Sequence, residues 1–174
     1  MIVAIDFGIT NTDVAVSNKS QYKFFSIPSK NANESFIDEI ISLIDIDITE
    51  ISQIVVTGGK SNELNESYKG VNLTKISETD AIGYGTKEIY KIENEPFVTL
   101  SCGTGTACIH HQDGQFSYIG GIAVGGGAIS GLSKAILDSS SLEEITDLAL
   151  KGNRKNIDLL IGDVVNEIGI LNSN

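Results

Sequence analysis

Two short segments of the chain combine glycine and threonine in a pattern that suits phosphate binding. Residues 6–12 follow the apolar run 2–5, and residues 101–106 follow the run 97–100. Glycine lets the backbone approach an anion closely, and threonine adds a hydroxyl donor beside the backbone N–H groups. The residues expected to donate to phosphate oxygens are Gly8, Thr10, Asn11, Gly103, Thr104, Gly105 and Thr106. Two such loops facing one another would hold a polyphosphate, which points to a nucleotide-dependent phosphotransferase.

Either loop alone could be an ordinary turn, because glycine is common in the turns of β-hairpins. The repetition argues against that alternative. Each loop is followed by a second strand, at 13–16 or 107–110, then by a polar turn and by a third strand, at 22–25 or 116–119. This diverged duplication predicts two related lobes around a cleft.

Two carboxylates stand where phosphoryl transfer could use them. Asp6 ends an apolar strand beside the first loop, so its oxygens could bind Mg²⁺, or it could simply accept backbone N–H groups in the turn. Glu78 begins a predicted helix after a strand, so it could take a proton from a substrate hydroxyl. Equally, Glu78 could only complement the helix dipole beside a capping box of Ser77 and Asp80. The pattern leaves both alternatives open.

A third glycine-rich stretch leads into a helix. Gly120, Gly121, Gly125, Gly126 and Gly127 fall within eight residues. Glycines before a helix N-terminus leave backbone N–H groups free for an anion. Five glycines are more than a turn requires, so we predict ligand contact here.

Composition excludes several classes of function. A formal net charge of −11 argues against binding to nucleic acid or to an anionic membrane surface. Met1 runs straight into an apolar strand, and no apolar stretch reaches about 18 residues, so we expect a cytoplasmic protein. The two cysteines, Cys102 and Cys108, have no zinc-type spacing and are expected to be small buried hydrophobes.

The order of predicted elements defines the fold class. Apolar residues recur at three-and-four spacing over 33–45 and predict an amphipathic helix there: Phe36, Ile37, Ile40, Ile41 and Ile44. With the three strands before it, the other elements give the order βββαβαβα with mixed strand pairing, which matches a ribonuclease-H-like lobe over residues 1–93. The remaining predicted elements of this lobe are a strand at 54–56, a polar helical turn at 61–67, a strand at 71–76 and a helix at 78–92.

A second ribonuclease-H-like lobe is predicted to start at residue 94 and to extend to residue 174. It repeats the three strands and then becomes helical. Its predicted helices span residues 126–138, 142–150 and 156–168. The final strands of the first lobe have no counterpart in this second copy, so we expect it to be partial, with an unpaired sheet edge.

Taken in order, these motifs resemble the type II pantothenate kinases, in the superfamily of acetate and sugar kinases, heat-shock ATPases and actin. No single motif is specific, but the ordered set covers nearly the whole chain. The matching segments are Ile5-Asp6-x-Gly8-x-Thr10, Thr57-Gly58-Gly59, Glu78-x-Asp80-Ala81, Gly103-Thr104-Gly105-Thr106, Gly120-Gly121-Ile122, Gly125-Gly126-Gly127, Gly131-Leu132 and Gly152-Asn153-Arg154 with Ile157-Asp158.

The resemblance implies actin-like ATPase lobes and transfer of the ATP γ-phosphoryl group to the primary hydroxyl of pantothenate, in coenzyme A biosynthesis. It implies that Glu78 is the base, that Asp6 helps to bind Mg²⁺, and that both loops and residues 125–127 hold ATP phosphates. Tyr118, Gly120 and Gly121 would lie near the substrate. The resemblance also implies a homodimer, for which the helices from Gly126 onward are the expected interface.

The chain departs from the family pattern at three places. Ile9 and Asp13 stand where the family has a glycine and a lysine, and Ser117-Tyr118 replaces an arginine used near the substrate. The family also continues beyond residue 174 into its adenine-binding portion. Two alternatives therefore stay open. Tyr118 favours another hydroxyl substrate or a partner enzyme as the target, and Asp13 favours a degenerate nucleotide-binding pseudokinase. Glu78 favours the kinase.

Overall fold

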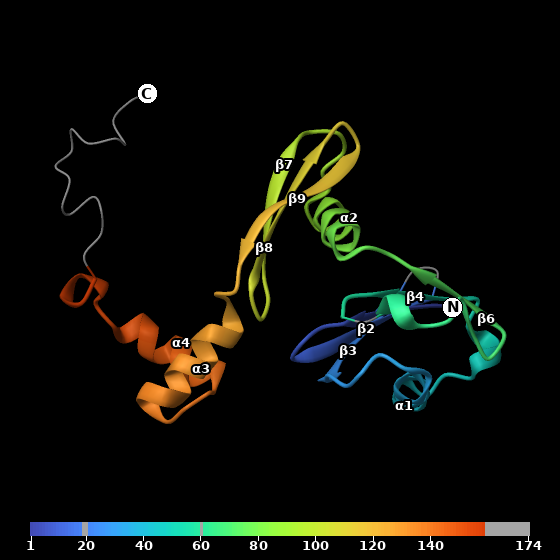
Figure 1. Cartoon of the computed structure of the whole chain (residues 1–174), viewed down its shortest axis with the longest axis horizontal. Coiled ribbons are helices and arrows are strands. Elements are labelled where there is room, and N and C mark those ends of the chain that lie inside the picture. The colour runs from blue at the N-terminus through green and yellow to red at the C-terminus, as the bar shows by residue number, and fades with distance from the viewer. Residues whose placement is uncertain (19–20, 60, 159–174) are drawn as a thin grey trace. The chain divides into compact units, whose positions relative to one another are not determined.

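The computed structural model describes residues 1–18, 21–59 and 61–158 (Figure 1). Internal contacts divide the chain into two units, Met1–Ala128 and Ile129–Asn174. The first unit contains both β-sheets and helices α1 and α2. The predicted division between two lobes at residue 93 stays a prediction.

The first sheet has six strands and mixed pairing. Its order is β3-β2-β1-β4-β6-β5, with β1, β2 and β3 antiparallel and with β4 parallel to both β1 and β6. The predicted turn at 61–67 forms a 3₁₀ helix, Ser61–Glu63, and β5 adds a short hairpin arm to β6. The strands are β1 Ile2–Phe7, β2 Asn11–Asn18, β3 Gln21–Pro28, β4 Gln53–Thr57, β5 Ser67–Tyr68 and β6 Val71–Lys75.

Helix α1, Glu34–Ile44, covers one face of this sheet. It begins where predicted because the Asn33 side chain accepts a hydrogen bond from the Phe36 N–H at 2.9 Å. Its buried residues pack on alternate residues of the central strands. Burial of each such side chain contributes about 1.5–3 kcal/mol to the stability of the fold. The core members from β1, β2 and β4 are Val3, Ile5, Phe7, Val14, Val16, Ile54 and Val56.

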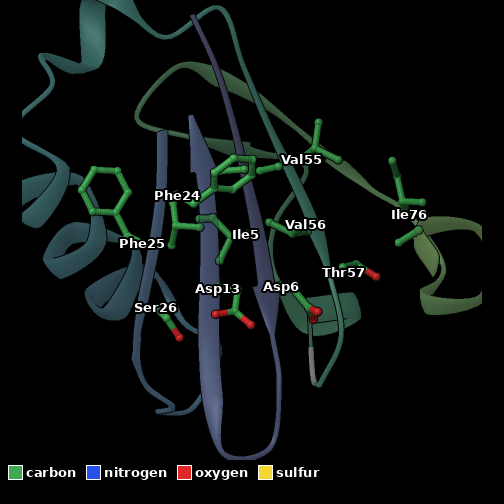
Figure 2. A pocket seen from close by; sticks show the side chains of 14 residues that line it. Ile5, Asp6, Asp13, Phe24, Phe25, Ser26, Val55, Val56, Thr57 and Ile76 are labelled. Atoms are coloured by element: carbon green, nitrogen blue, oxygen red, sulfur yellow. The ribbon is translucent and has the colours of Figure 1, made fainter. Parts of the chain in front are cut away.

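Strand alternation sends the intervening residues to the other face of the sheet. Asp6 lies between the buried residues Ile5 and Phe7 and points away from α1. Figure 2 shows this face, with Asp6, Asp13 and Thr57 near one end of their strands. The packing of α1 on one face therefore fixes which side chains are available for chemistry on the other.

The second sheet has three antiparallel strands in the order β7-β8-β9. These are β7 Phe97–Cys102, β8 Thr106–Gln112 and β9 Gln115–Ile122. Helix α2, Glu78–Tyr90, contacts all three strands. The Phe116 ring lies 4.8 Å from the Tyr84 ring and 4.9 Å from His111, centroid to centroid. The helix that carries Glu78 is thus held by the second sheet.

Two glycines of α2 provide a matched stability test. A Cβ on Gly83 would lie 2.3 Å from Phe116 Cδ1, whereas a Cβ on Gly85 would meet nothing within 4 Å. We expect Gly83→Ala to lower the free energy of unfolding by about 1–2 kcal/mol, because overpacking outweighs the gain in helix propensity. Gly85→Ala should raise it by about 0.5–1 kcal/mol. Urea unfolding of both variants measures the difference, and equal values would contradict this account of the α2 contact.

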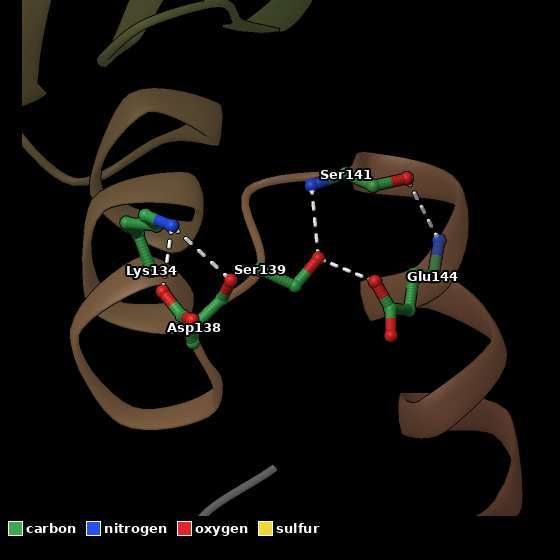
Figure 3. Close-up of polar contacts among 5 residues, drawn as sticks. All are labelled: Lys134, Asp138, Ser139, Ser141 and Glu144. Atoms are coloured by element: carbon green, nitrogen blue, oxygen red, sulfur yellow. Dashed lines mark hydrogen bonds and ion pairs between the residues drawn. The ribbon is translucent and has the colours of Figure 1, made fainter.

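The second unit contains most of helix α3, Gly126–Leu137, and all of helix α4, Leu142–Lys151. Both helices lie where the sequence predicted helices, at 126–138 and 142–150. Figure 3 shows the polar contacts around the connection between α3 and α4. Lys134 Nζ donates to Asp138 Oδ1 at 2.6 Å, Ser139 Oγ donates to Glu144 Oε2 at 2.5 Å, and Ser141 Oγ accepts the Glu144 N–H at 3.3 Å. A 3₁₀ turn follows at Arg154–Asn156. The predicted helix at 156–168 lies mostly outside the described residues.

Within the part of the chain that the structure describes, no helix combines the length and the apolar character needed to cross a membrane.

Candidate active site

The structure brings the two glycine and threonine loops together. Thr10 Oγ1 and Thr104 Oγ1 lie 3.0 Å apart, although 94 positions separate them in the chain. Both loops are tight. The Gly8 N–H donates to the Asp6 carbonyl at 3.0 Å, and the Gly103 N–H donates to the Gly105 carbonyl at 2.8 Å. The hydroxyl groups at the two loop tips therefore face one point, as a polyphosphate site requires.

Glycine is needed in the first loop for steric reasons. A Cβ on Gly8 would lie 2.4 Å from the Asn11 carbonyl oxygen, which any side chain at this position would displace. Asn11 itself is the first residue of β2 and is exposed. The loop can therefore approach an anion through its backbone, with the Thr10 hydroxyl beside it.

A row of three polar side chains crosses the sheet beside this loop. Asp6 is paired with Asp13 across the antiparallel β1–β2 pair and with Thr57 across the parallel β1–β4 pair (Figure 2). Directly opposed like charges repel. Burial, then the charge of Glu78, then that of Asp13 raise the pKa of the Asp6 carboxyl above its usual value. The site therefore concentrates negative charge that a bound cation would relieve.

Glu78 stands at the first position of α2. Ser77 caps the helix by accepting the Asp80 N–H at 3.0 Å, and Ser77 Oγ donates to Asp80 Oδ2 at 2.7 Å. The predicted pair of Ser77 and Asp80 thus forms at the helix start, with the Ser77 hydroxyl bonded to both the N–H and the carboxylate of Asp80. Among residues 1–18, 21–59 and 61–158, the Glu78 carboxylate accepts no hydrogen bond. Its exposed carboxylate is available to a substrate, and it is near enough to Asp6 to affect that residue's pKa.

The glycines at 125–127 pack against the second loop, and two of them donate hydrogen bonds to its backbone carbonyls. The Gly126 N–H donates to the Gly103 carbonyl at 2.8 Å, and the Gly127 N–H donates to the Thr104 carbonyl at 3.2 Å. A Cβ on Gly125 would lie 2.6 Å from the Gly105 carbonyl oxygen. These N–H groups therefore bind loop carbonyls, and direct phosphate contact by residues 125–127 stays a prediction.

Tyr118, Gly120 and Gly121 lie together on β9 beside the second loop. A Cβ on Gly121 would meet the Tyr118 hydroxyl at 2.4 Å and the Thr106 carbonyl oxygen at 2.6 Å. Thr106 Oγ1 donates in turn to the Val124 carbonyl at 2.8 Å. The Tyr118 side chain is 59% exposed and can contact a ligand. Its predicted role in substrate binding stays a prediction.

A pocket of about 560 Å³ opens beside Asp6 on the sheet face opposite α1 (Figure 2). Its walls are mainly apolar side chains from β1, β2, β3 and β4, and Ala81 of α2 also lines it. The polar members are Asp6, Asp13, Ser26 and Thr57. The pocket is large enough for part of a small organic molecule next to the carboxylates.

Sequence reasoning missed two residues of this site. Thr57 Oγ1 is buried next to Asp6 and has no hydrogen-bond partner among the described residues. Ser29 is bonded to three residues of the first loop. The signal for Thr57 was present, since it ends a strand predicted beside β1 and begins the segment Thr57-Gly58-Gly59. Ser29 carries no comparable signal.

The expectation of two buried cysteines is wrong for Cys102, which is exposed at the end of β7, and Cys108 is half-buried. An antiparallel strand with one covered face leaves alternate residues open, and Cys102 falls on the open side.

Comparison with known proteins agrees with the family resemblance seen in the sequence. A model of the Fumble family matches residues 83–171. The type II pantothenate kinase of Bacillus anthracis is 35% identical over 169 residues, covering 93% of this chain and 58% of that protein. The type II pantothenate kinase of Staphylococcus aureus strain USA300 is 28% identical over 165 residues, covering 92% of this chain and 58% of that protein. The chain thus spans 58% of the length of these curated relatives.

Solved structures support the fold class. The activator of the 2-hydroxyisocaproyl-CoA dehydratase from Clostridium difficile, with bound ADPNP, aligns with a TM-score of 0.62 and 17% identity over 87% of this chain and 57% of that chain. A ROK family protein from Streptococcus pneumoniae, in complex with sucrose, aligns with a TM-score of 0.53 and 14% identity. The alignment covers 87% of this chain and 68% of that chain. The predicted fold, ribonuclease-H-like lobes of the actin-like ATPase type, is confirmed. Because the family model covers just over half of the chain, this protein belongs to the Fumble family.

Proposed function

We propose that this protein transfers the γ-phosphoryl group of ATP to a hydroxyl group of a small molecule, and that this molecule is pantothenate. The meeting of two phosphate-type loops, with Thr10 Oγ1 and Thr104 Oγ1 3.0 Å apart, carries the proposal. Asp6 begins the first loop segment, and Glu78 is near enough to Asp6 for its charge to raise the pKa of that carboxyl. The relatives named type II pantothenate kinases support the choice of substrate.

The proposed roles follow from what each group can do. Backbone N–H groups and hydroxyls of Gly8, Thr10, Gly103 and Thr104 would donate to phosphate oxygens and hold the γ-phosphorus in line with the acceptor. Glu78 would take the proton of the acceptor hydroxyl as its oxygen bonds to phosphorus and the bond to the ADP oxygen breaks. Phosphoryl transfer requires mostly positioning and charge neutralisation, so these few groups are sufficient.

The residues present also fit Mg²⁺. This ion prefers oxygen ligands and is usually held by one or two protein carboxylates together with substrate phosphates. Asp6 provides a carboxylate whose pKa is raised by burial and by the charges of Glu78 and Asp13, and the Thr57 hydroxyl, which has no hydrogen-bond partner among the described residues, lies next to it. No cluster of three or more His, Cys, Asp or Glu that could hold a metal occurs in the described ranges. Bound Mg²⁺ would neutralise charge on the phosphates.

The test is turnover by the protein itself. We expect incubation with MgATP and pantothenate to yield phosphorylated pantothenate and ADP in equal amounts, measured by mass spectrometry and a coupled ADP assay, with no ADP above background when pantothenate is omitted. Stabilisation by MgATP without product would contradict the substrate assignment. If MgATP gives neither product nor stabilisation, nucleotide binding by this chain is contradicted.

We also propose a cytoplasmic homodimer. Ile129, Leu132 and Ile136 recur on one side of α3 and are exposed, which supports the helices from Gly126 onward as the interface.

A second candidate function, that of a degenerate pseudokinase in which nucleotide binding is weakened, is favoured by one observation. Asp13 places a negative charge directly opposite Asp6, where phosphates would be repelled.

We expect Asp13→Lys to lower the Kd for MgATP about tenfold by removing one charge and adding its opposite. Titration calorimetry measures the change. Glu66→Lys makes the same charge change just before β5, at the opposite edge of the sheet from β3, and should have little effect. If Asp13→Lys binds MgATP no better than wild type, Asp13 does not limit nucleotide binding.

A further inference from the structure

Ser29 lies outside both phosphate loops but is bonded to the first of them. It follows β3, which ends at Pro28, and is half-buried. Its N–H donates to the Thr10 carbonyl at 3.0 Å. Its hydroxyl donates to the Gly8 carbonyl and lies 2.8 Å from Thr12 Oγ1. One residue therefore contacts the beginning, the middle and the end of the loop.

The direction of these bonds follows from the number of protons. A serine hydroxyl has one proton to donate, and the Gly8 carbonyl accepts it. The Thr12 hydroxyl must then be the donor to Ser29 Oγ. Because the Thr12 side chain is fully buried, with 0% exposed, it has no access to water as a substitute acceptor. The chain Thr12 to Ser29 to Gly8 is thus a connected network whose central member is Ser29.

The network fixes the part of the loop that would face phosphate. Gly8 and Thr12 flank Thr10, whose hydroxyl is 3.0 Å from that of Thr104 in the second loop. The loop is already close-packed, since a Cβ on Gly8 would collide with the Asn11 carbonyl. Without the Ser29 hydroxyl, the Gly8 carbonyl would lose its side-chain donor and the buried Thr12 hydroxyl would lose its acceptor. The loop would then rearrange to satisfy both groups.

We infer that Ser29 is a positioning residue for ATP: it holds the first phosphate loop in the geometry that directs Gly8 and Thr10 at the nucleotide. The inference rests on the proposed nucleotide site between the two loops. Ser29 itself does not touch the reacting atoms, and its hydrogen bonds within the described residues all go to the loop. Glu78 lies on α2 and is not part of this network, so ATP binding should change more than the chemical step.

The test compares three variants of the full chain. Ser29→Ala removes the hydroxyl, and Ser29→Thr keeps it. Ser52→Ala is the matched control, because Ser52 Oγ also donates to a backbone carbonyl, that of Met1 at 2.8 Å, but away from the loops. We expect Ser29→Ala to raise the Kd and the KM for MgATP about tenfold, as loss of one hydrogen bond at a binding site does, while kcat changes less than about twofold. Ser29→Thr should stay within about threefold of wild type, and Ser52→Ala should bind MgATP like wild type.

The outcomes separate this inference from the proposed function. A folded Ser29→Ala variant with wild-type Kd and KM for MgATP would overturn it, as would equal losses in Ser29→Ala and Ser29→Thr. If wild type itself gains no stability from MgATP, the proposed function fails, and the role of Ser29 fails with it. Should Ser29→Ala not fold, Ser29→Cys keeps the size and replaces the hydroxyl with a weak donor, and the same rise in Kd is expected.

Discussion

Glu78→Gln is expected to lower kcat for phosphoryl transfer about 10³-fold and to leave the Kd for MgATP within about twofold of wild type. Glutamine has nearly the same shape but cannot accept the proton of the acceptor hydroxyl at neutral pH. The helix start should survive, because Ser77 and Asp80 are bonded to each other independently of Glu78. Steady-state kinetics with pantothenate and calorimetric titration of MgATP separate the chemical step from binding.

Asp80→Asn is the matched control for this variant. It removes the same charge from the same helical turn, but from a side chain that is engaged in capping. We expect a lower melting temperature with kcat reduced less than about tenfold, since a cap is worth about 1 kcal/mol. If Glu78→Gln retained wild-type kcat, the base would have to be another group.

Asp6→Asn is expected to lower kcat about 100-fold and to raise the melting temperature of the nucleotide-free protein at pH 8. The pKa of Asp6 is raised in the folded protein by burial and by the charges of Glu78 and Asp13. An acid with a raised folded pKa binds its proton more tightly when folded, so its ionisation costs stability. The cost appears as the pH rises above the ordinary aspartate pKa of about 3.9 and is complete above the folded pKa. Asparagine, which never ionises, avoids it.

The pH dependence provides the measurement. Melting temperatures are measured from pH 3 to 8, without and with MgATP. Without MgATP, the melting temperature of Asp6→Asn should rise relative to that of wild type only as the pH rises. With MgATP, Asp6→Asn should lose most of the stabilisation that wild type gains. Asp45→Asn is a suitable control, because Asp45 caps the C-terminus of α1 in the left-handed conformation that asparagine also tolerates. A variant that is less stable than wild type at pH 8 would show that Asp6 is not under electrostatic strain.

Local patterns in the sequence were sufficient for much of this fold. The spacing of the apolar residues from Phe36 to Ile44 identified α1. The structure adds that Asn33 caps its N-terminus, through a local interaction that spans three residues. The two loops could be predicted because turn chemistry is equally local. The duplication of the loop-and-strand pattern was the reason to expect the two loops to face one another.

What the sequence did not reveal depends on contacts between distant segments. The row Asp13, Asp6 and Thr57 exists only in one strand register, and a shift of one residue would turn each side chain to the other face. The contact of Ser29 with Gly8 likewise depends on where β3 ends. At Gly126 and Gly127 the sequence indicated N–H groups suited to an anion, but carbonyls of the second loop accept them.

The close approach of Gly83 to Phe116 sets a positional tolerance for the proposed base. Glu78 lies five residues before Gly83 on the same helix. A slip of α2 by one residue along its axis would move Glu78 by about 1.5 Å and turn it by about 100°. A displacement of about 1 Å can cost 100-fold in rate. Because Gly83 has no room for a methyl group, its packing against the second sheet limits how far Glu78, more than one helical turn away, can be displaced. The rate of the proposed proton transfer therefore depends on packing against the second sheet.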